Sequence, residues 1–88
     1  MKGFVYILRL DNGNYYIGST NSLERRIGEH KGGREKYTSK FLPIDLVFSQ
    51  EYESLKMARN IERKLKKLKR KDIIERIISD GKIRMSGC

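Results

Sequence analysis

Hydrophobic residues occur in short runs separated by turn residues, and the first two runs predict a β-hairpin. Residues 3–10 alternate loosely and are rich in aromatic and β-branched side chains, which are typical of a strand. Residues 14–19 form the second run, and the segment Asp11-Asn12-Gly13-Asn14 between the two is a turn sequence that can fold them together. A third strand is predicted at residues 44–52, after a polar loop over residues 32–43 that ends at its proline. Its apolar positions, which are partly in phase, are Leu46, Phe48 and Tyr52.

Helical spacing follows the second predicted strand. Asn21, with Glu24 three residues later, has the arrangement of a capping box and predicts a helix start. The helix ends near Gly32, and Gly28 in its middle costs it about 1 kcal/mol relative to alanine. The positions that share its inner face are Leu23, Ile27 and His30.

Two more helices are predicted in the second part of the chain. Ser54 can cap a helix with a strong apolar stripe, and Asp72, with Glu75 three residues later, repeats the cap-plus-acid pattern for the last helix. Asp80-Gly81 ends that helix. The apolar positions of the first of these helices are Leu55, Ala58, Ile61, Leu65 and Leu68. Those of the last helix are Ile73, Ile74, Ile77 and Ile78.

The predicted order of elements is β-β-α-β-α-α, which indicates an α+β fold: a small three-stranded antiparallel sheet flanked by helices. With 88 residues the chain is expected to form one domain over residues 1–82, followed by a tail at 83–88. No apolar run is long enough to cross a bilayer. The single cysteine, Cys88, excludes an intrachain disulfide and a cysteine-based zinc site, and it favours a cytoplasmic protein.

The net charge of +9 is concentrated in the second part of the chain. Residues 1–52 carry eight Lys or Arg and six acidic residues, whereas residues 53–88 carry twelve and five. The run Arg63–Lys71 keeps its leucines in phase with the predicted core stripe, so it belongs to a folded helix. Such a surface favours a polyanion, most simply nucleic acid. The alternative is a basic face that only solvates the protein, or one that meets an acidic protein partner.

Four side chains in the first part of the chain have the chemistry of a phosphate site. Tyr6 and Tyr16 lie on the two hairpin strands, and Arg26 and His30 lie one helical turn apart, about 40° around the helix axis. Arginine can bind a phosphate in a bidentate manner, and histidine can relay a proton near neutral pH. The alternative is ordinary: core tyrosines with solvated hydroxyls, a solvated arginine and a histidine at the rim of the core.

Glu62 lies beside the apolar stripe of the second predicted helix, next to the basic run. A lone carboxylate there could bind Mg²⁺, which is commonly held by few protein oxygens together with water and phosphate. It could equally form an i,i+4 ion pair with Lys66, worth about 0.2–0.5 kcal/mol. The spacing alone does not decide between the two.

At these residues the chain resembles the GIY-YIG nuclease superfamily, in particular its small single-domain members, which are similar to the N-terminal catalytic module of the bacterial excision-repair incision subunit. Tyr16-Ile17-Gly18 matches the second name motif, and Tyr6 occupies the tyrosine position of the first. The segment from Thr20 to His30 resembles the arginine helix of the family. Glu62 occupies the metal-binding glutamate position, and the segments Tyr37–Lys40 and Leu46-Val47 resemble the connecting region of the small members.

This resemblance implies a metal-dependent endonuclease. Arg26 would hold the scissile phosphate, and Glu62 would hold one divalent ion, Mg²⁺ or Mn²⁺, that steadies the leaving oxygen. Tyr6 or Tyr16 would orient or deprotonate the attacking water with support from His30, and we favour Tyr6 as the base and Tyr16 as the hydroxyl beside the phosphate. The expected nucleic-acid contacts are Arg25, Lys40, Arg63, Lys66, Lys67 and Arg70.

DNA is expected as the substrate more than RNA, in repair or recombination, and a homodimer, a further protein partner or the loop from Lys31 to Phe41 would supply any sequence preference. Two positions depart from the family pattern. Phe4 stands where the first motif has glycine, and Ser19 stands where many members carry a basic residue. These departures keep open a second function, a non-catalytic nucleic-acid-binding module of the same fold.

Overall fold

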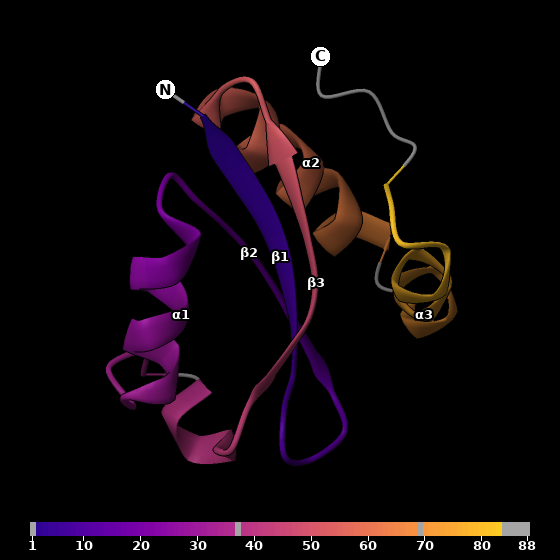
Figure 1. Ribbon diagram of the computed structural model, residues 1–88. Coiled ribbons are helices and arrows are strands. Elements are labelled where there is room, and N and C mark those ends of the chain that lie inside the picture. The colour runs from indigo at the N-terminus through magenta and orange to yellow at the C-terminus, as the bar shows by residue number, and fades with distance from the viewer. Residues whose placement is uncertain (1, 37, 69, 84–88) are drawn as a thin grey trace.

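The computed structural model describes residues 2–36, 38–68 and 70–83, which form one antiparallel sheet packed between helices (Figure 1). This arrangement confirms the predicted α+β class and the order of the elements. The strands are β1 (Gly3–Arg9), β2 (Tyr15–Thr20) and β3 (Asp45–Tyr52). The helices are α1 (Leu23–Lys31), the short 3₁₀ helix η1 (Thr38–Phe41), α2 (Leu55–Leu68) and α3 (Lys71–Asp80).

The sheet has the order β2-β1-β3, with both neighbours antiparallel to the central strand β1. The predicted turn closes the β1–β2 hairpin: the Leu10 amide donates to the Asn14 carbonyl at 2.8 Å, and Gly13 has a φ of +84°. Only glycine adopts that left-handed conformation without strain, which explains the glycine in this turn. The hairpin register places Tyr6 directly across from Gly18.

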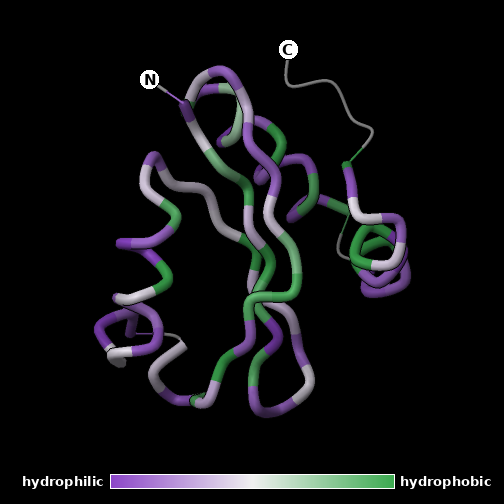
Figure 2. The backbone as a smooth tube through the Cα atoms, viewed as in Figure 1, coloured by the Kyte–Doolittle hydropathy of each residue, from purple (hydrophilic) through white to green (hydrophobic). Residues whose placement is uncertain are grey.

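Helices cover both faces of the sheet, so the central strand is buried on both sides. Val5 and Ile7 point into a core shared with α2 and α3, and Tyr6 and Leu8 point into a second, smaller core that includes partly buried residues of α1. This explains why the first run of the sequence is almost continuously apolar, as Figure 2 shows for the middle of the sheet. Because successive side chains alternate between faces, β1 carries Tyr6 to the side where α1 lies.

Strand β3 departs from the predicted phase. A register shift between Ile7 and Leu8 of β1 leaves Phe48 paired with Ile7 but brings Leu46, not Val47, opposite Leu8. Of the three positions predicted to be partly in phase, Phe48 and Tyr52 pack in the core shared with α2 and α3, whereas Leu46 does not: Phe48 is 7% exposed and Leu46 is 40% exposed. The extra residue at a bulge moves one side chain to the other face, which a period-two pattern cannot anticipate.

The helix ends agree with the prediction in part. Ser54 caps α2, since its Oγ accepts the Met57 amide at 3.2 Å, and Gly81 ends α3 in the left-handed conformation. The predicted cap at Asn21 is wrong, because the cap position of α1 is Ser22 and no side chain caps it. The predicted cap at Asp72 is also wrong: α3 begins at Lys71, so this carboxylate lies in the first turn.

Two further details concern the end of the chain. Leu68, predicted in the apolar stripe of α2, is 39% exposed, because α2 ends at this residue. Ile83, which the sequence assigned to the tail, is buried, and its amide donates to Oε1 of Gln50 at 2.7 Å. Residues 84–88, including Cys88, lie outside the described residues, and the domain boundary at 82 stays a prediction. Among the described residues, no helix has the length and apolar character to cross a membrane.

Candidate active site

Tyr6 points from β1 across the neighbouring strand, and Gly18 leaves the room for its ring. A Cβ added to Gly18 would overlap the hydroxyl and Cζ of Tyr6. The Tyr6 ring crosses β2 at Gly18, where β2 has no side chain. The tyrosine of the first name motif therefore requires the glycine of the second. Tyr16, on the same strand, has its ring centre 6.4 Å from that of Tyr6.

His30 joins the tyrosines to η1. Its side chain is fully buried, with Nε2 3.0 Å from the Tyr6 hydroxyl and Nδ1 2.8 Å from Oγ1 of Thr38. The ring of Tyr16 packs edge-on against it at 5.1 Å. Both imidazole nitrogens thus have a partner, and the buried ring cannot turn without losing one of them. His30 was predicted on the inner face of α1, and Thr38 is a partner that the sequence analysis did not single out.

The hydrogen bonds around Tyr6 define the direction of this chain. The Arg26 guanidinium, which can only donate, lies near enough to the Tyr6 hydroxyl to lower its pKa, so the hydroxyl oxygen faces a cation. The Tyr6 proton is then directed to Nε2 of His30, so that a neutral His30 carries its own proton on Nδ1 and donates it to Thr38. The order of donors along these hydrogen bonds is Tyr6, His30, Thr38.

Burial favours the neutral forms of Tyr6 and His30. Burial raises the pKa of Tyr6 to about 12, against a smaller lowering by Arg26. Burial, followed by the charge of Arg26, lowers the pKa of His30 below its ordinary value, although Glu35 and Glu29 oppose this. A neutral imidazole with a bare Nε2 can therefore accept the Tyr6 proton at neutral pH.

This order can be tested directly, because His30 is the only histidine. In ¹⁵N spectra of the imidazole we expect the Nδ1–H form to dominate at pH 7.5 and the titration to fall below the ordinary value of 6.5. Thr38→Val removes the acceptor at Nδ1 and is expected to shift the population toward the Nε2–H form. A dominant Nε2–H form in the wild-type protein would contradict the order.

Arg26 is held by two carboxylates. Its guanidinium pairs with Glu29 at 3.1 Å and with Glu35 at 2.8 Å, and its side chain is 25% exposed. Burial lowers the pKa of Arg26, but the bonds from Glu35, Tyr6 and Glu29 outweigh it and raise the pKa above its usual range. Arg26 also lines a polar surface hollow together with Ser19, Arg25 and Arg59. A phosphate entering this hollow would compete with Glu29 and Glu35 for the Arg26 guanidinium, which is always charged.

Glu62 faces an adjoining hollow on the α2 side. One carboxylate oxygen accepts a hydrogen bond from Ser19, and the other pairs with Lys66 Nζ at 2.6 Å, the i,i+4 alternative raised by the spacing. This hollow is lined by Ser19, Arg59, Glu62, Arg63 and Lys66, so it shares Ser19 and Arg59 with the hollow at Arg26. Glu62 is also close enough to Tyr6 to act on its pKa. Arg26 of α1 and Glu62 of α2 therefore line adjoining hollows, and the bonded pair Tyr6 and His30 lies buried beside them without lining either hollow.

The remaining predicted residues divide into two groups. Arg25 lines the hollow at Arg26, and Arg63 and Lys66 line the hollow at Glu62. Lys40 lies on η1, which follows α1 at its far end, and the exposed Lys67 lies near the end of α2 (Figure 1). The exposed Arg70 pairs with Asp72 at 2.7 Å.

Several residues of the site were not predicted from the sequence. Arg59 stands three residues before Glu62 and so shares its helix face, a signal that was available. Glu29 stands three residues after Arg26 and was available in the same way. Glu35 and Thr38 reach the site through the loop after α1, which no periodicity describes. Ser19, noted only as a departure from the family pattern, donates a hydrogen bond to the Glu62 carboxylate.

Comparison with known proteins identifies the class to which this fold and site belong. Residues 2–76 match the family described as the GIY-YIG catalytic domain. A UPF0213 protein from Streptococcus pneumoniae serotype 4 is 39% identical over 70 residues, which cover 78% of this chain and 71% of the relative. A UPF0213 protein from Natronomonas pharaonis is 35% identical over 78 residues, covering 88% and 91%.

A solved structure agrees with these sequence matches. The solution NMR structure of a UPF0213 protein from Bacillus halodurans has a TM-score of 0.59 and 33% identity, and the match covers 92% of this chain and 87% of that one. The chain therefore belongs to the GIY-YIG endonuclease superfamily and, within it, to the small UPF0213 family.

Proposed function

We propose that this protein is a metal-dependent endonuclease that hydrolyses phosphodiester bonds in DNA. The family implies a nucleic-acid substrate and a divalent metal in general terms. The observation that carries the proposal for this chain is the position of the Tyr6 hydroxyl. It bonds to His30 and lies within electrostatic reach of Arg26 and Glu62, so a guanidinium that could bind phosphate, a proton acceptor and a carboxylate lie around one hydroxyl.

Arg26 is proposed to bind the scissile phosphate. Its guanidinium already presents its donors to two carboxylates, the geometry that a phosphate would use in their place. Donors that face the charge developing on a phosphoryl oxygen stabilise the transition state more than the ground state. Arg25 and Arg59 line the same hollow and would bind the neighbouring phosphates. Tyr16, half-buried beside His30, would supply a hydroxyl on the phosphate side.

Proton removal from the attacking water is proposed to run through Tyr6 to His30. With a pKa of about 12, Tyr6 is hardly ionised at neutral pH and cannot act as a preformed base. It can, however, accept a proton from water while it passes its own proton to Nε2 of His30, 3.0 Å away. The water oxygen bonds to phosphorus while the bond from phosphorus to the leaving sugar oxygen breaks, and His30 ends as a cation that donates to Thr38. Burial, followed by the charge of Arg26, lowers the pKa of His30, so the accepted proton leaves readily and can pass through Tyr6 and water to the leaving oxygen.

Glu62 fits the role of the metal ligand. Its carboxylate, next to the Ser19 hydroxyl, is a hard oxygen donor that lines a surface hollow. The same hollow is lined by the cations Arg59, Arg63 and Lys66. Because Glu62 supplies only one carboxylate, substrate phosphate and water would have to complete the coordination shell of the metal ion. Among the described residues no group of three or more His, Cys, Asp or Glu is placed for a metal. Bound there, Mg²⁺ or Mn²⁺ would neutralise charge on the leaving oxygen.

A second function is favoured by the ion pairs of the site. Both oxygens of Glu62 are engaged, and Arg26 is held by Glu29 and Glu35. If these pairs persist with nucleic acid bound, the protein is a binding module that does not cut. Such a module would bind with strong salt dependence, with or without added metal, and regardless of Glu62. We also propose that the substrate is DNA more than RNA and that the protein acts in repair or recombination. A homodimer or a further protein partner, and a cytoplasmic location, are proposals as well.

The proposal is tested by nicking of supercoiled plasmid and branched DNA. We expect the wild-type protein to nick in Mg²⁺ or Mn²⁺ and to stop when a chelator is added. Tyr6→Phe removes the hydroxyl and is expected to slow nicking by about 10²- to 10⁴-fold, the usual range for a lost acid–base group. The matched control is Tyr52→Phe, which removes a hydroxyl that bonds to Gln50 on β3. Binding without nicking under all these conditions would support the module instead.

A further inference from the structure

A separate hollow lies between β2, α2 and α3. Tyr15 forms part of its lining, the apolar residues Ile17, Leu65 and Ile74 provide hydrophobic surface, and the cations Lys66, Arg70 and Lys71 complete it. We call it the Tyr15 hollow. Its composition, an aromatic ring and aliphatic side chains next to several positive charges, differs from that of the polar hollow at Arg26.

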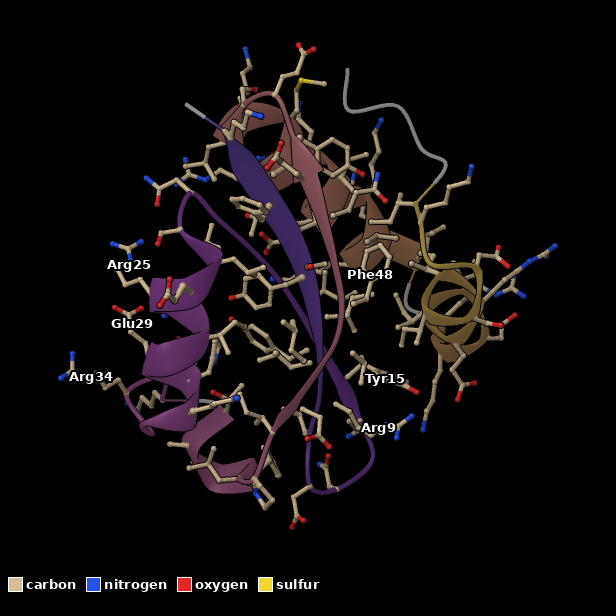
Figure 3. All side chains as sticks on the ribbon, viewed as in Figure 1. Arg9, Tyr15, Arg25, Glu29, Arg34 and Phe48 are labelled. Atoms are coloured by element: carbon tan, nitrogen blue, oxygen red, sulfur yellow. The ribbon has the colours of Figure 1, made fainter. Side chains whose placement is uncertain are left out.

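The ring of Tyr15 is flanked by positive charge. The guanidinium carbon of Arg9 lies 5.9 Å from the ring centre and Lys71 Nζ lies 5.7 Å away, and Figure 3 shows Arg9 and Tyr15 on the side of the sheet that faces α3. Both cations are exposed, on long flexible side chains. The Tyr15 hydroxyl donates a long bond, 3.5 Å, to Glu75, and the ring is partly buried against the core shared with α2 and α3. Because the exposed side chains of Arg9 and Lys71 can change rotamer, a flat ligand can reach the ring. The phosphate of such a ligand would then pair with the two cations.

The Tyr15 hollow adjoins the proposed catalytic region through Lys66. That side chain lines both this hollow and the hollow at Glu62, and its Nζ also lies 5.8 Å from the ring centre of Tyr16. Glu62 and Lys66 are one turn apart on α2, about 6 Å along the axis. A strand with a phosphate at Glu62 would therefore reach the Tyr15 hollow within about three nucleotides, at 3.4 Å per stacked step.

We propose that the Tyr15 hollow binds an unpaired nucleotide that neighbours the scissile phosphate. Its base would stack on the Tyr15 ring, and its phosphates would meet Lys66, Arg70 and Lys71. A base inside a duplex has both faces covered by its neighbours, so only an unpaired base can use the ring. This inference rests on the proposed function for the position of the cut, and it names the substrate class: a strand with a single-stranded extension or branch, of DNA or RNA.

Binding without cleavage tests the inference. Affinities are measured by fluorescence anisotropy in EDTA, for a blunt two-stranded DNA duplex and for the same duplex with a six-nucleotide overhang of DNA or of RNA. Tyr15→Ala is expected to weaken binding of an overhang duplex by about 5- to 100-fold and of the blunt duplex less than twofold. Tyr15→Phe keeps the ring and is expected to bind like the wild type, and thermal melting of each variant verifies folding.

The outcomes separate this inference from the proposed function. Selective loss with the DNA or with the RNA overhang supports the Tyr15 hollow and shows which strand it takes, even if the wild-type protein never cuts. Equal loss on blunt and overhang duplexes, or no loss on either, overturns it, even if plasmid is nicked. A Tyr15→Phe variant as weak as Tyr15→Ala would also overturn it, because a stacking surface needs the ring and not the hydroxyl.

Discussion

Replacing Glu62 with glutamine is expected to reduce nicking by about a thousandfold in Mg²⁺. The amide keeps an oxygen that can accept from Ser19 but loses the charge that would hold the metal ion. Metal stabilisation of charge in the transition state is worth several kcal/mol, and about 4 kcal/mol corresponds to this factor. The rate is measured as loss of supercoiled plasmid under single-turnover conditions, with protein in excess.

The matched control is Glu51→Gln on β3. Glu51 also pairs with a lysine, Lys2 at 2.8 Å, so its replacement removes a carboxylate and an ion pair of the same kind far from the site. We expect its nicking rate to stay within twofold of the wild type, and both variants to bind DNA with similar affinity in EDTA. If Glu62→Gln nicks as fast as the wild type, Glu62 has no role in cleavage.

Gly18→Ala is expected to damage both stability and activity. The added methyl group overlaps the hydroxyl and Cζ of Tyr6, so either the ring or strand β2 must move. Overpacking of this kind costs about 1–3 kcal/mol of unfolding free energy. Since a displacement of about 1 Å at a reacting group can cost a hundredfold in rate, we expect nicking to fall by about that factor. Urea denaturation and the plasmid assay measure the two effects.

Gly28→Ala is expected to have the opposite effect on stability. Gly28 lies in the middle of α1, between Arg26 and His30, and a Cβ added there meets no other atom within 4 Å. The substitution should therefore stabilise the protein by about 0.5–1 kcal/mol, because alanine is the better helix former, and leave nicking unchanged. Wild-type stability and activity in Gly18→Ala would contradict the position of Tyr6 across β2.

The sequence predicted the elements well where the pattern was continuous. The unbroken apolar run of β1 and the stripe of α2 follow from burial, which acts on every residue of an element. Features decided by one residue were predicted poorly. The bulge in β3 exposed Leu46, and the starts of α1 and α3 use Ser22 and Arg70 instead of the carboxamide and carboxylate caps. These choices depend on tertiary contacts worth about 1 kcal/mol each, which local sequence does not reveal.

The same distinction holds for the candidate site. Tyr6, Tyr16, Arg26, His30 and Glu62 could be selected because their motif spacing is local and because the chain resembles a known family. Their partners could not. Thr38 and Glu35 enter through the irregular loop after α1, and Ser19 meets Glu62 across 43 residues of sequence. Contacts between a loop and a helix depend on the folded arrangement, so hydrophobic periodicity contains no information about them.

The most direct test of the central claim, that Arg26 and Glu62 act on one phosphate in one site, is a double-mutant cycle. Single-turnover cleavage rates are measured for the wild type, Arg26→Lys, Glu62→Asp and the double variant, since these conservative changes leave measurable activity. We predict that the double variant is close to the slower single variant, because two groups that act as a unit are lost only once. Losses that multiply, or a wild-type protein that cuts none of the DNA substrates, would contradict the claim.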